Sequence, residues 1–465
     1  MPCKIRLIQV NPAEINLQLF NIFTDITMKK KVLLIGNGAR EHAIAEALMR
    51  SPQHVELTVI GSAVNPAIRD MAERYEVGSV TDLDFIQGIA NEVRPDFAIV
   101  GPEGPIEAGV VDMLLENEIP SCSPMKTVAR LESSKSFTRD LLAKYSIYGN
   151  PLFKVFFDEK GLEEMFDELG DDFVVKADGL KGGKGVKVSG DHLNGKEEGL
   201  AYARECLAEG GRVILEEKLV GEEFSLMSFC DGVNTVEMPC VQDHKRAYED
   251  DKGPNTGGMG SYGDADLLLP FLTMSDVVAA REITRKVAGA LREETGTKFV
   301  GIMYGGFIVT SRGVKLIEYN ARFGDPEAMN ILPILKTDFV EICESMINGT
   351  LDQVEIDFED KATVCKYVVP NGYPDDPCKG EKIEVGSVPE GVRVYYASVD
   401  QKEDGLYLSG SRAVAFVGIA DSLEEAERLA ESATGSVTGP VFYRKDIGTA
   451  ELVQKRIDHM KELRG

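Results

Sequence analysis

Short apolar runs separated by helical patterns dominate the first part of the chain. Residues 31–35, 57–60 and 97–100 are almost entirely apolar, as is typical of strands buried on both faces of a parallel sheet. The segments between them carry apolar residues at helical spacing. This alternation predicts a parallel sheet with right-handed crossovers, as in a Rossmann-like domain.

The pattern changes from about Lys126 onward. Four further apolar runs predict strands, at 173–176, at 213–215, near Gly305 and at 314–317. The segment at 242–260 is too polar to be core and is predicted to be a long loop, and loops of this length in compact enzymes are usually functional. After about Asn348 a smaller segment of mixed helices and strands completes the chain.

These patterns predict a multi-domain protein of the α/β and α+β classes, and its 465 residues suit about three domains. We expect a Rossmann-like domain at 28–127, a central module at 128–347 and a small α+β domain at 348–465. Residues 1–27 are expected to be an extension that is not translated, since Met28 directly precedes the first strand. They also lack the apolar core of a signal peptide.

Composition narrows the classes of partner. The formal net charge is −26, which excludes a general nucleic-acid surface and argues against binding to an anionic membrane surface. No apolar run is long enough to span a membrane. The eight cysteines are scattered without a C-x-x-C pair, which indicates reduced thiols in a cytoplasmic protein rather than a disulfide framework or a zinc site.

The most informative polar residues follow the predicted strand at 314–317. Successive side chains of a strand alternate between its faces, so one face is expected to carry Glu318, Asn320 and Arg322, and the other Ile317, Tyr319 and Ala321. A carboxylate and an amide oxygen about 6–7 Å apart can both reach a divalent cation on a polyphosphate. Arg322 can hold a carboxylate with two parallel hydrogen bonds. The alternative is an edge strand with a solvated polar face.

The first strand runs into a glycine-rich turn that contains Gly36, Gly38, Arg40 and Glu41. It is not a dinucleotide fingerprint, because Glu41 stands at the third glycine position and no acid closes the second strand. We expect free N–H groups at a helix N-terminus here, an anion site suited to a sugar phosphate, with a tight turn alone as the alternative. The third strand ends in a turn with Glu103, at the sheet edge where such folds bind ligands.

A second glycine-rich segment follows Lys176 and does not match a Walker A loop. Its Gly182, Gly183, Lys184 and Gly185 are predicted to form a flap over phosphates, with Lys176 as a point charge. The alternative is a hairpin with solvated lysines. Further on, the strand edge that contains Glu216, Glu217 and Leu219 suits adenine, and Glu223 suits ribose hydroxyls. Taken singly, such carboxylates are more often surface residues.

Taken together, these motifs resemble the phosphoribosylamine–glycine ligase family (glycinamide ribonucleotide synthetases) of the ATP-grasp superfamily. The resemblance extends from Met28 to the end of the chain, and 242–246 and 253–260 are its most specific parts. The other matching motifs are 36–42, 101–103, 131–135, 176–180, 183–185, 318–327 and 444–448. The family implies a Rossmann-like N-terminal domain, a central ATP-grasp module with a mobile lid at about 150–218, and a C-terminal domain that closes the site.

The resemblance also implies the chemistry. ATP, glycine and 5-phosphoribosylamine give glycinamide ribonucleotide, ADP and phosphate through glycyl phosphate, a step of purine synthesis that uses Mg²⁺ or Mn²⁺. We expect small-molecule substrates, a monomer and a transient contact with the preceding enzyme of the pathway. Arg322 is expected to orient the glycine carboxylate and Asp243 to receive its ammonium group, while His244 is expected to position its neighbours rather than to act as a general base.

Carried onto this chain, the family pattern assigns four groups of residues. ATP is expected at Lys135, Lys176, Gly182, Gly183, Lys184, Gly185, Glu216, Glu217, Leu219 and Glu223. The other substrates are expected at Gly36, Gly38, Arg40, Glu41, Glu103, Asn255, Thr256, Gly257 and Asp325. The metal is expected at Glu318 and Asn320, and the catalytic contacts at Arg322, Asp243, Lys245 and Arg246.

The chain departs from the common family pattern at Ala39, at Ser133 and at 180–182. Gly306 stands where some members carry a metal-binding glutamine. Three rival interpretations stay open from the sequence. They are another ATP-grasp carboxylate–amine ligase, a nicotinamide-dependent oxidoreductase based on the first glycine-rich turn alone, and a nucleotide-binding regulatory protein without turnover.

Overall fold

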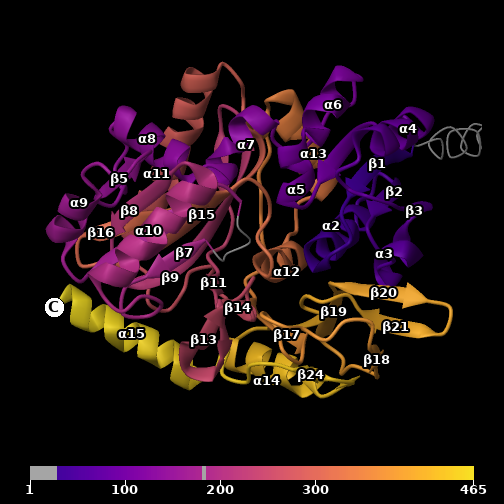
Figure 1. Ribbon diagram of the computed structural model, residues 1–465. Helices are drawn as coiled ribbons and strands as arrows, with labels where there is room; N and C mark the ends of the chain where they lie inside the picture. Colours follow the sequence, from indigo (N-terminus) through magenta and orange to yellow (C-terminus); the bar gives the residue numbers. More distant parts are fainter. Residues whose placement is uncertain (1–28, 181–184) are drawn as a thin grey trace, which may run out of the picture.

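The structure is a computed structural model, and it describes residues 29–180 and 185–465 (Figure 1). The expected extension at 1–27 and the predicted flap residues Gly182, Gly183 and Lys184 lie outside the described residues.

The N-terminal sheet is parallel, with strand order β3-β2-β1-β4. Its strands are β1 (Lys30–Ile35), β2 (Val55–Gly61), β3 (Arg74–Val77) and β4 (Phe97–Val100), and its helices are α2 (Ala39–Met49), α3 (Pro66–Met71), α4 (Leu83–Val93), α5 (Glu103–Ala108) and α6 (Val110–Glu116). The last four residues of β1 and all of β4 are buried, so the predicted Rossmann-like class is confirmed. Strand β3 was not predicted, because it is a half-exposed edge strand without apolar alternation.

The second sheet, with order β5-β8-β6-β7, is antiparallel and has its own apolar core. It comprises β5 (Phe153–Phe156), β6 (Phe173–Ala177), β7 (Val186–Val188) and β8 (Val213–Glu217), covered by α9 (Leu162–Leu169) and α10 (Lys196–Gly210). The core contains Phe166, Phe173 and Leu215, and all its members lie between Phe156 and Leu215. We refer to this sheet with its two helices as the lid sheet.

The third sheet, β10-β9-β15-β16, is antiparallel and carries the segment with the predicted metal ligands. Its strands are β9 (Glu222–Asp231), β10 (Thr235–Glu237), β15 (Val300–Thr310) and β16 (Gly313–Asn320). The helices around it are α7 (Lys126–Ser133), α8 (Lys135–Lys144), α11 (Met274–Thr295), α12 (Glu327–Ile331) and α13 (Phe339–Asn348), with short 3-10 turns at Leu332–Ile334 and Leu351–Gln353.

The C-terminal sheets reach back to the polar segment at 242–260. Strands β11 (Gln242–Asp243) and β14 (Gly260–Gly263) join β17 (Ala362–Pro370), β22 (Val414–Ala420), β19 (Val392–Tyr396) and β24 (Val441–Phe442). Strands β18 (Lys382–Val385), β20 (Val399–Lys402), β21 (Gly405–Leu408) and β23 (Val437–Thr438) form a fourth antiparallel sheet, and α14 (Leu423–Thr434) packs on β17 and β22.

Between β11 and β14 the chain forms a hairpin, β12 (Arg246–Tyr248) and β13 (Lys252–Asn255), around a 3-10 turn at Glu249–Asp251. The segment was predicted only as a long polar loop, and the two strands within it were missed. Its strands are short and rich in polar residues, and β14 pairs with β17, about a hundred residues away in the sequence, so local patterning could not show them.

The last helix, α15 (Ala450–Arg464), leaves the C-terminal sheets and returns to pack beside β9 (Figure 1). No helix among the described residues has the length and apolar character needed to cross a membrane.

Candidate active site

Strand β16 carries the two predicted metal ligands, and a bulge determines where they point. In the pairing of β15 with β16, Ile317 is the extra residue between Leu316 and Glu318. The strict alternation predicted from the sequence therefore fails at Ile317, because a bulge re-aims the side chains that follow it. Beyond the bulge Tyr319 is 2% exposed, while Glu318 and Asn320 are partly exposed on the other face.

Cations from three segments surround the Glu318 carboxylate. Lys245 Nζ lies 3.8 Å from Glu318 Oε1 and 3.9 Å from Glu223 Oε2. Burial alone would raise the pKa of Glu318, but the charges of Lys245, Lys176 and Lys135 outweigh it and lower the pKa. Glu318 is consequently an anion at neutral pH.

The chain offers few protein oxygens for a cation at this point. Among the described residues, no group of three or more His, Cys, Asp or Glu side chains is arranged to hold a metal. A Cβ atom on Gly306 would lie 3.7 Å from Cγ of Glu318, so this glycine is adjacent to the carboxylate but supplies no side-chain oxygen. A divalent ion here would take Glu318 and Asn320 and complete its shell with phosphate and water oxygens.

Lys176 is fixed by a buried network of charges. Its Nζ lies 2.8 Å from Glu216 Oε2, and Arg139 Nε donates to Glu216 Oε1 at 2.6 Å. Both cations also donate to the carbonyl of Ile317, Lys176 at 3.2 Å and Arg139 at 2.7 Å. Burial would raise the pKa of Glu216, but Arg139 and Lys176 pull it down to about 2. Arg139 was not predicted, although it lies one helical turn after Lys135.

The other predicted ATP-binding residues that the structure describes come from the lid sheet, from α8 and from the start of β9. Lys135 Nζ donates to the carbonyl of Gly179 at 2.9 Å, and the carbonyl of Gly185 accepts from the N–H of Ala177 at 2.8 Å. Glu217 accepts from the N–H of Leu152 at 2.9 Å and pairs with Arg312. Leu219 is half-buried in the turn after β8, and Glu223 is exposed at the start of β9.

Arg322 stands just beyond β16, where it meets two carboxylates. Its NH2 lies 3.0 Å from Glu132 Oε1, and its Nε lies 3.4 Å from Glu103 Oε2. Burial would raise the pKa of Glu103, but Arg322 and Arg40 lower it to about 2. NH2 of Arg322 also donates weakly to Asn320 Oδ1, at 3.4 Å. The predicted glycine-binding arginine thus links the predicted metal ligand Asn320 to helices α5 and α7.

The first glycine-rich turn encloses the Glu41 carboxylate. Glu41 accepts from the N–H of Gly38 at 2.7 Å and from Arg40 Nε at 2.6 Å, so its carboxylate occupies the first N–H at the N-terminus of α2. A Cβ atom on Gly101 would lie 2.1 Å from Glu41 Oε1, so the glycines make room for this carboxylate. The N–H of Gly38 is therefore not free for a phosphate. Arg40 NH1 donates to the carbonyl of Phe323 at 3.2 Å.

Asp243 has an unpartnered oxygen. Its Oδ1 is buried and has no hydrogen-bond partner in the part of the chain that the structure describes. A Cβ atom on Gly258 would lie 2.7 Å from this oxygen, so only a glycine leaves the space open. Burial, together with the carboxylate of Glu327, raises the pKa of Asp243 well above its ordinary value. A cationic group in that space would restore the ionised carboxylate.

His244 follows Asp243 and is 2% exposed. Neither ring nitrogen has a hydrogen-bond partner among the described residues, and its ring centre lies 5.8 Å from that of Tyr262. Burial, aided by the charge of Arg444, lowers its pKa to about 3. The ring is therefore neutral at physiological pH.

The predicted substrate residues of the hairpin region lie together. The N–H and the hydroxyl of Thr256 both donate to the carbonyl of Lys245, at 2.7 and 2.8 Å. Asn255 pairs with Arg246 across the hairpin. These contacts hold the start and end of the hairpin together beside Glu318.

Arg412 was not predicted, yet it joins several predicted segments. Its NH1 donates to the carbonyls of Gly257 at 2.7 Å and Asp325 at 2.8 Å, and lies 3.3 Å from Asp325 Oδ1. The guanidinium also lies over the ring of Tyr367, 4.6 Å from its centre. An arginine from the C-terminal sheets thus ties together the loops that flank Asp243.

Comparison with known proteins agrees with this arrangement. Residues 30–132, 133–328 and 363–450 match the N domain, the ATP-grasp (A) domain and the C domain of phosphoribosylglycinamide synthetase. A phosphoribosylamine–glycine ligase of Methanosarcina acetivorans is 49% identical over 438 residues, covering 94% of this chain and 99% of the relative. One from Methanocaldococcus jannaschii is 50% identical over 445 residues, covering 93% and 100%.

The solved structures extend the match to the fold. The crystal structure of the phosphoribosylamine–glycine ligase from Thermotoga maritima superposes with a TM-score of 0.75 at 29% identity, covering 90% of this chain and all of the other. All three domains of the family are matched in order along the chain. The chain therefore belongs to the phosphoribosylglycinamide synthetase (phosphoribosylamine–glycine ligase) family of ATP-grasp enzymes.

Proposed function

We propose that this protein joins glycine to 5-phosphoribosylamine with ATP, through glycyl phosphate, to form glycinamide ribonucleotide, ADP and phosphate. The observation that carries the proposal is the ionised Glu318, faced by Lys245 from the hairpin and Lys176 from the lid sheet. Such a cluster suits a metal–polyphosphate complex. Relatives that match nearly the whole chain are named for this reaction.

Glu318 and Asn320 fit a Mg²⁺ or Mn²⁺ ion, because both offer hard oxygens on one face of β16. Such an ion would neutralise charge on the β- and γ-phosphates. Lys135 and Lys176 then bring positive charge to the phosphates. The buried pairing of Lys176 with Glu216 fixes its direction, so little order is lost when ATP binds.

We assign the glycine site to Arg322 and Asp243. The buried, unpartnered Oδ1 of Asp243 suits an ammonium group, which would restore the ionised form of the carboxylate. Arg322 holds the glycine carboxylate, whose oxygen then attacks the γ-phosphorus; the bond from this phosphorus to the bridging oxygen breaks, and ADP leaves. Arg322 pairs with two carboxylates, of which Glu132 is buried and Glu103 is 40% exposed. We therefore infer that glycine displaces Glu103 from Arg322 and leaves the pair with Glu132 intact.

In the second step the amine of phosphoribosylamine attacks the carbonyl carbon of glycyl phosphate, and phosphate leaves. Glu103, released from Arg322, then accepts hydrogen bonds from the sugar on the side of the N-terminal sheet. The loop at 255–257 is held by Lys245 and Arg412. Closure of the lid sheet keeps water from the acyl phosphate.

The direct test is the release of ADP from ATP and Mg²⁺. It is measured with glycine alone and with glycine plus phosphoribosylamine, generated in place from ribose 5-phosphate and ammonia. Sustained turnover that needs all three substrates supports the proposed reaction. Binding of ATP without turnover would contradict the assigned substrates, and other carboxylate and amine pairs would then be compared in the same assay.

A further inference from the structure

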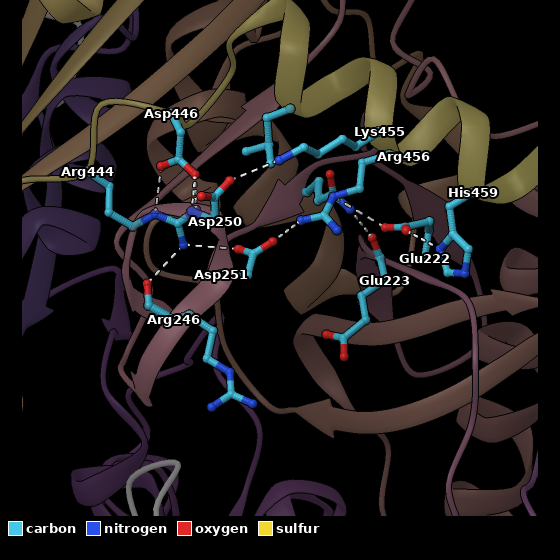
Figure 2. Close-up of polar contacts among 12 residues, drawn as sticks. Glu222, Glu223, Arg246, Asp250, Asp251, Arg444, Asp446, Lys455, Arg456 and His459 are labelled. Carbon is cyan, nitrogen blue, oxygen red and sulfur yellow. Dashed lines mark hydrogen bonds and ion pairs between the residues drawn. The ribbon is translucent and has the colours of Figure 1, made fainter. Parts of the chain in front are cut away.

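The motif at 444–448 matches the family pattern but has no part in the mechanism so far. Its Arg444 is 1% exposed and donates to Asp446 at 2.9 and 2.7 Å. The same guanidinium donates to the carbonyl of Arg246 at 2.9 Å and to Asp251 Oδ1 at 3.1 Å (Figure 2). A buried arginine of the C-terminal region thus connects Asp446 to the β12–β13 hairpin.

The tip of this hairpin needs such support. Asp250 and Asp251 have φ angles of 59° and 53°, in the left-handed region that side chains rarely adopt. Asp446 accepts from the N–H of Asp250 at 3.0 Å, and Lys455 Nζ lies 2.9 Å from Asp250 Oδ1. Arg456 of α15 pairs with Asp251. Each of the two strained residues is therefore held from the C-terminal segment.

Helix α15 connects the same network of ion pairs to β9. Arg456 Nε lies 3.4 Å from Glu222 Oε2, and His459 Nδ1 lies 2.5 Å from Glu222 Oε1 (Figure 2). Glu222 directly precedes Glu223, which faces Lys245. The hairpin is consequently fastened to the sheet that carries the proposed ATP site.

At the other end of the hairpin, the Arg246 side chain points away from this cluster (Figure 2). Its NH2 lies 3.3 Å from Asp191 Oδ2, and its NH1 lies 3.3 Å from His192 Nε2. NH1 also donates to the carbonyl of Gly253 at 2.9 Å. Asp191 and His192 belong to the turn that follows β7, so this guanidinium joins the hairpin to the lid sheet.

We propose that Arg246 is a latch that holds the lid sheet over the reaction, and that Arg444 with Asp446 keeps the latch in position. This proposal rests on the proposed ligase function. In it Arg246 is a positioning residue that does not contact substrate, and this role replaces the catalytic contact expected for it from the family pattern. An ion pair with partly exposed partners is weak, so the latch can open at each turnover.

The latch has a chemical consequence. When the lid opens early, water attacks the carbonyl carbon of glycyl phosphate, and the C–O bond to phosphate breaks to give glycine and phosphate. ATP is then converted to ADP without formation of glycinamide ribonucleotide. The ratio of ADP released to glycinamide ribonucleotide formed therefore reports on the latch, whereas a loss of overall folding lowers both products together.

The experiment compares Arg246→Gln, Asp191→Asn and the double variant in the full chain, with all substrates present. The wild type is expected to release about one ADP per glycinamide ribonucleotide, and each single variant at least about three. The double variant is expected to be no worse than Arg246→Gln, because both changes break the same pair. Asp167→Asn is the matched control, since it removes another exposed ion pair of the lid sheet, with Lys196.

Arg444→Lys tests the support of the latch, because lysine keeps the charge and loses the planar fork. It is expected to raise the same ratio. Ratios near one in both Arg246→Gln and Asp191→Asn would overturn the proposal, as would a raised KM for phosphoribosylamine in Arg246→Gln with an unchanged ratio. A wild type that forms no glycinamide ribonucleotide would instead contradict the ligase function.

Discussion

At the scale of single residues, Glu318 owes its charge to its neighbours. Partial burial opposes ionisation, and Lys245, Lys176 and Lys135 overcome it. We predict that Glu318→Gln lowers kcat on the order of a hundredfold or more, because it removes an anionic ligand from a preorganised site. Steady-state rates over a range of Mg²⁺ concentrations measure this. A near-wild-type kcat of Glu318→Gln at saturating Mg²⁺ would contradict the assignment of Glu318 to the metal site. Glu425→Gln on α14 serves as the control.

Asp243 leads to a prediction on pH. Its pKa is raised, so the free enzyme tends to hold a proton there, whereas the ammonium group of glycine favours the ionised form. Binding of glycine should then release a proton, and the KM for glycine should fall as pH rises until Asp243 is ionised in the free enzyme. In Asp243→Asn this dependence should vanish and the KM should be high throughout. A KM for glycine that stays constant with pH in the wild type would contradict the assignment.

At the residue scale, the sequence predicted charged residues that belong to a recognisable motif, and it missed those that stand outside one. Glu318 and Asn320 stand out because a strand places alternate residues on one face. Arg139 could have been predicted, because it lies one helical turn after Lys135. Arg412 could not have been predicted, because its partners are backbone carbonyls of loops that lie far from it in the sequence.

At the scale of elements, the features that shape the site depend on how strands pair, and the pairing cannot be read from one segment of sequence. The bulge at Ile317 exists only relative to the register of β15, and it brings the Ile317 carbonyl to Lys176 and Arg139. The hairpin at 246–255 likewise looks like a loop until its neighbours are known. Long apolar strands such as β1 and β4 were predicted well, because burial on both faces leaves a continuous local signal.

Glu216 allows a prediction about how the lid sheet is attached. It is 3% exposed and pairs with Arg139 and Lys176, so Glu216→Gln leaves two buried cations without their anion and should cost about 3–5 kcal/mol of stability. Thermal unfolding of the variant measures this. The exposed pair of Glu159 with Arg204 is the control, and Glu159→Gln should cost at most about 1 kcal/mol.

The same pair fixes the sign of a pH effect. The pKa of Glu216 is lowered to about 2 in the folded protein, against about 4.3 for an unperturbed glutamate. Its contribution to stability is therefore fully present above about pH 4.3 and is lost as pH falls toward 2. The stability difference between the wild type and Glu216→Gln should shrink over that interval. A difference that stays constant between pH 5 and pH 2 would contradict the assigned pairing.

At the scale of the whole molecule, the site is assembled from parts that are distant in the sequence. The lid sheet has its own core, β16 supplies the predicted metal ligands, and the strands around Asp243 complete a sheet built mainly from C-terminal strands. The order of the domains was predictable from motifs, because each domain carries its own. The contacts between the C-terminal region and the hairpin were not predictable, because they depend on pairs that are distant in the sequence, such as Arg444 with Asp251.

Arg412 offers a test of this assembly. Lysine at this position would keep one charge, but its nitrogen lies one bond nearer the main chain than the NH1 that donates to the carbonyls of Gly257 and Asp325, so the loops on both sides of Asp243 would lose a shared support. We predict that Arg412→Lys lowers kcat/KM for glycine about tenfold to a hundredfold, as expected for the loss of one or two charge-assisted hydrogen bonds. The KM for ATP should change little, because Lys176 and Lys135 are held by the lid sheet and α8. Arg393→Lys, an exposed arginine on β19, is the matched control. An equal loss for ATP and glycine would mean that Arg412 supports the whole fold rather than the glycine site, and the C-terminal region would then act as a structural cover instead of a part of the site.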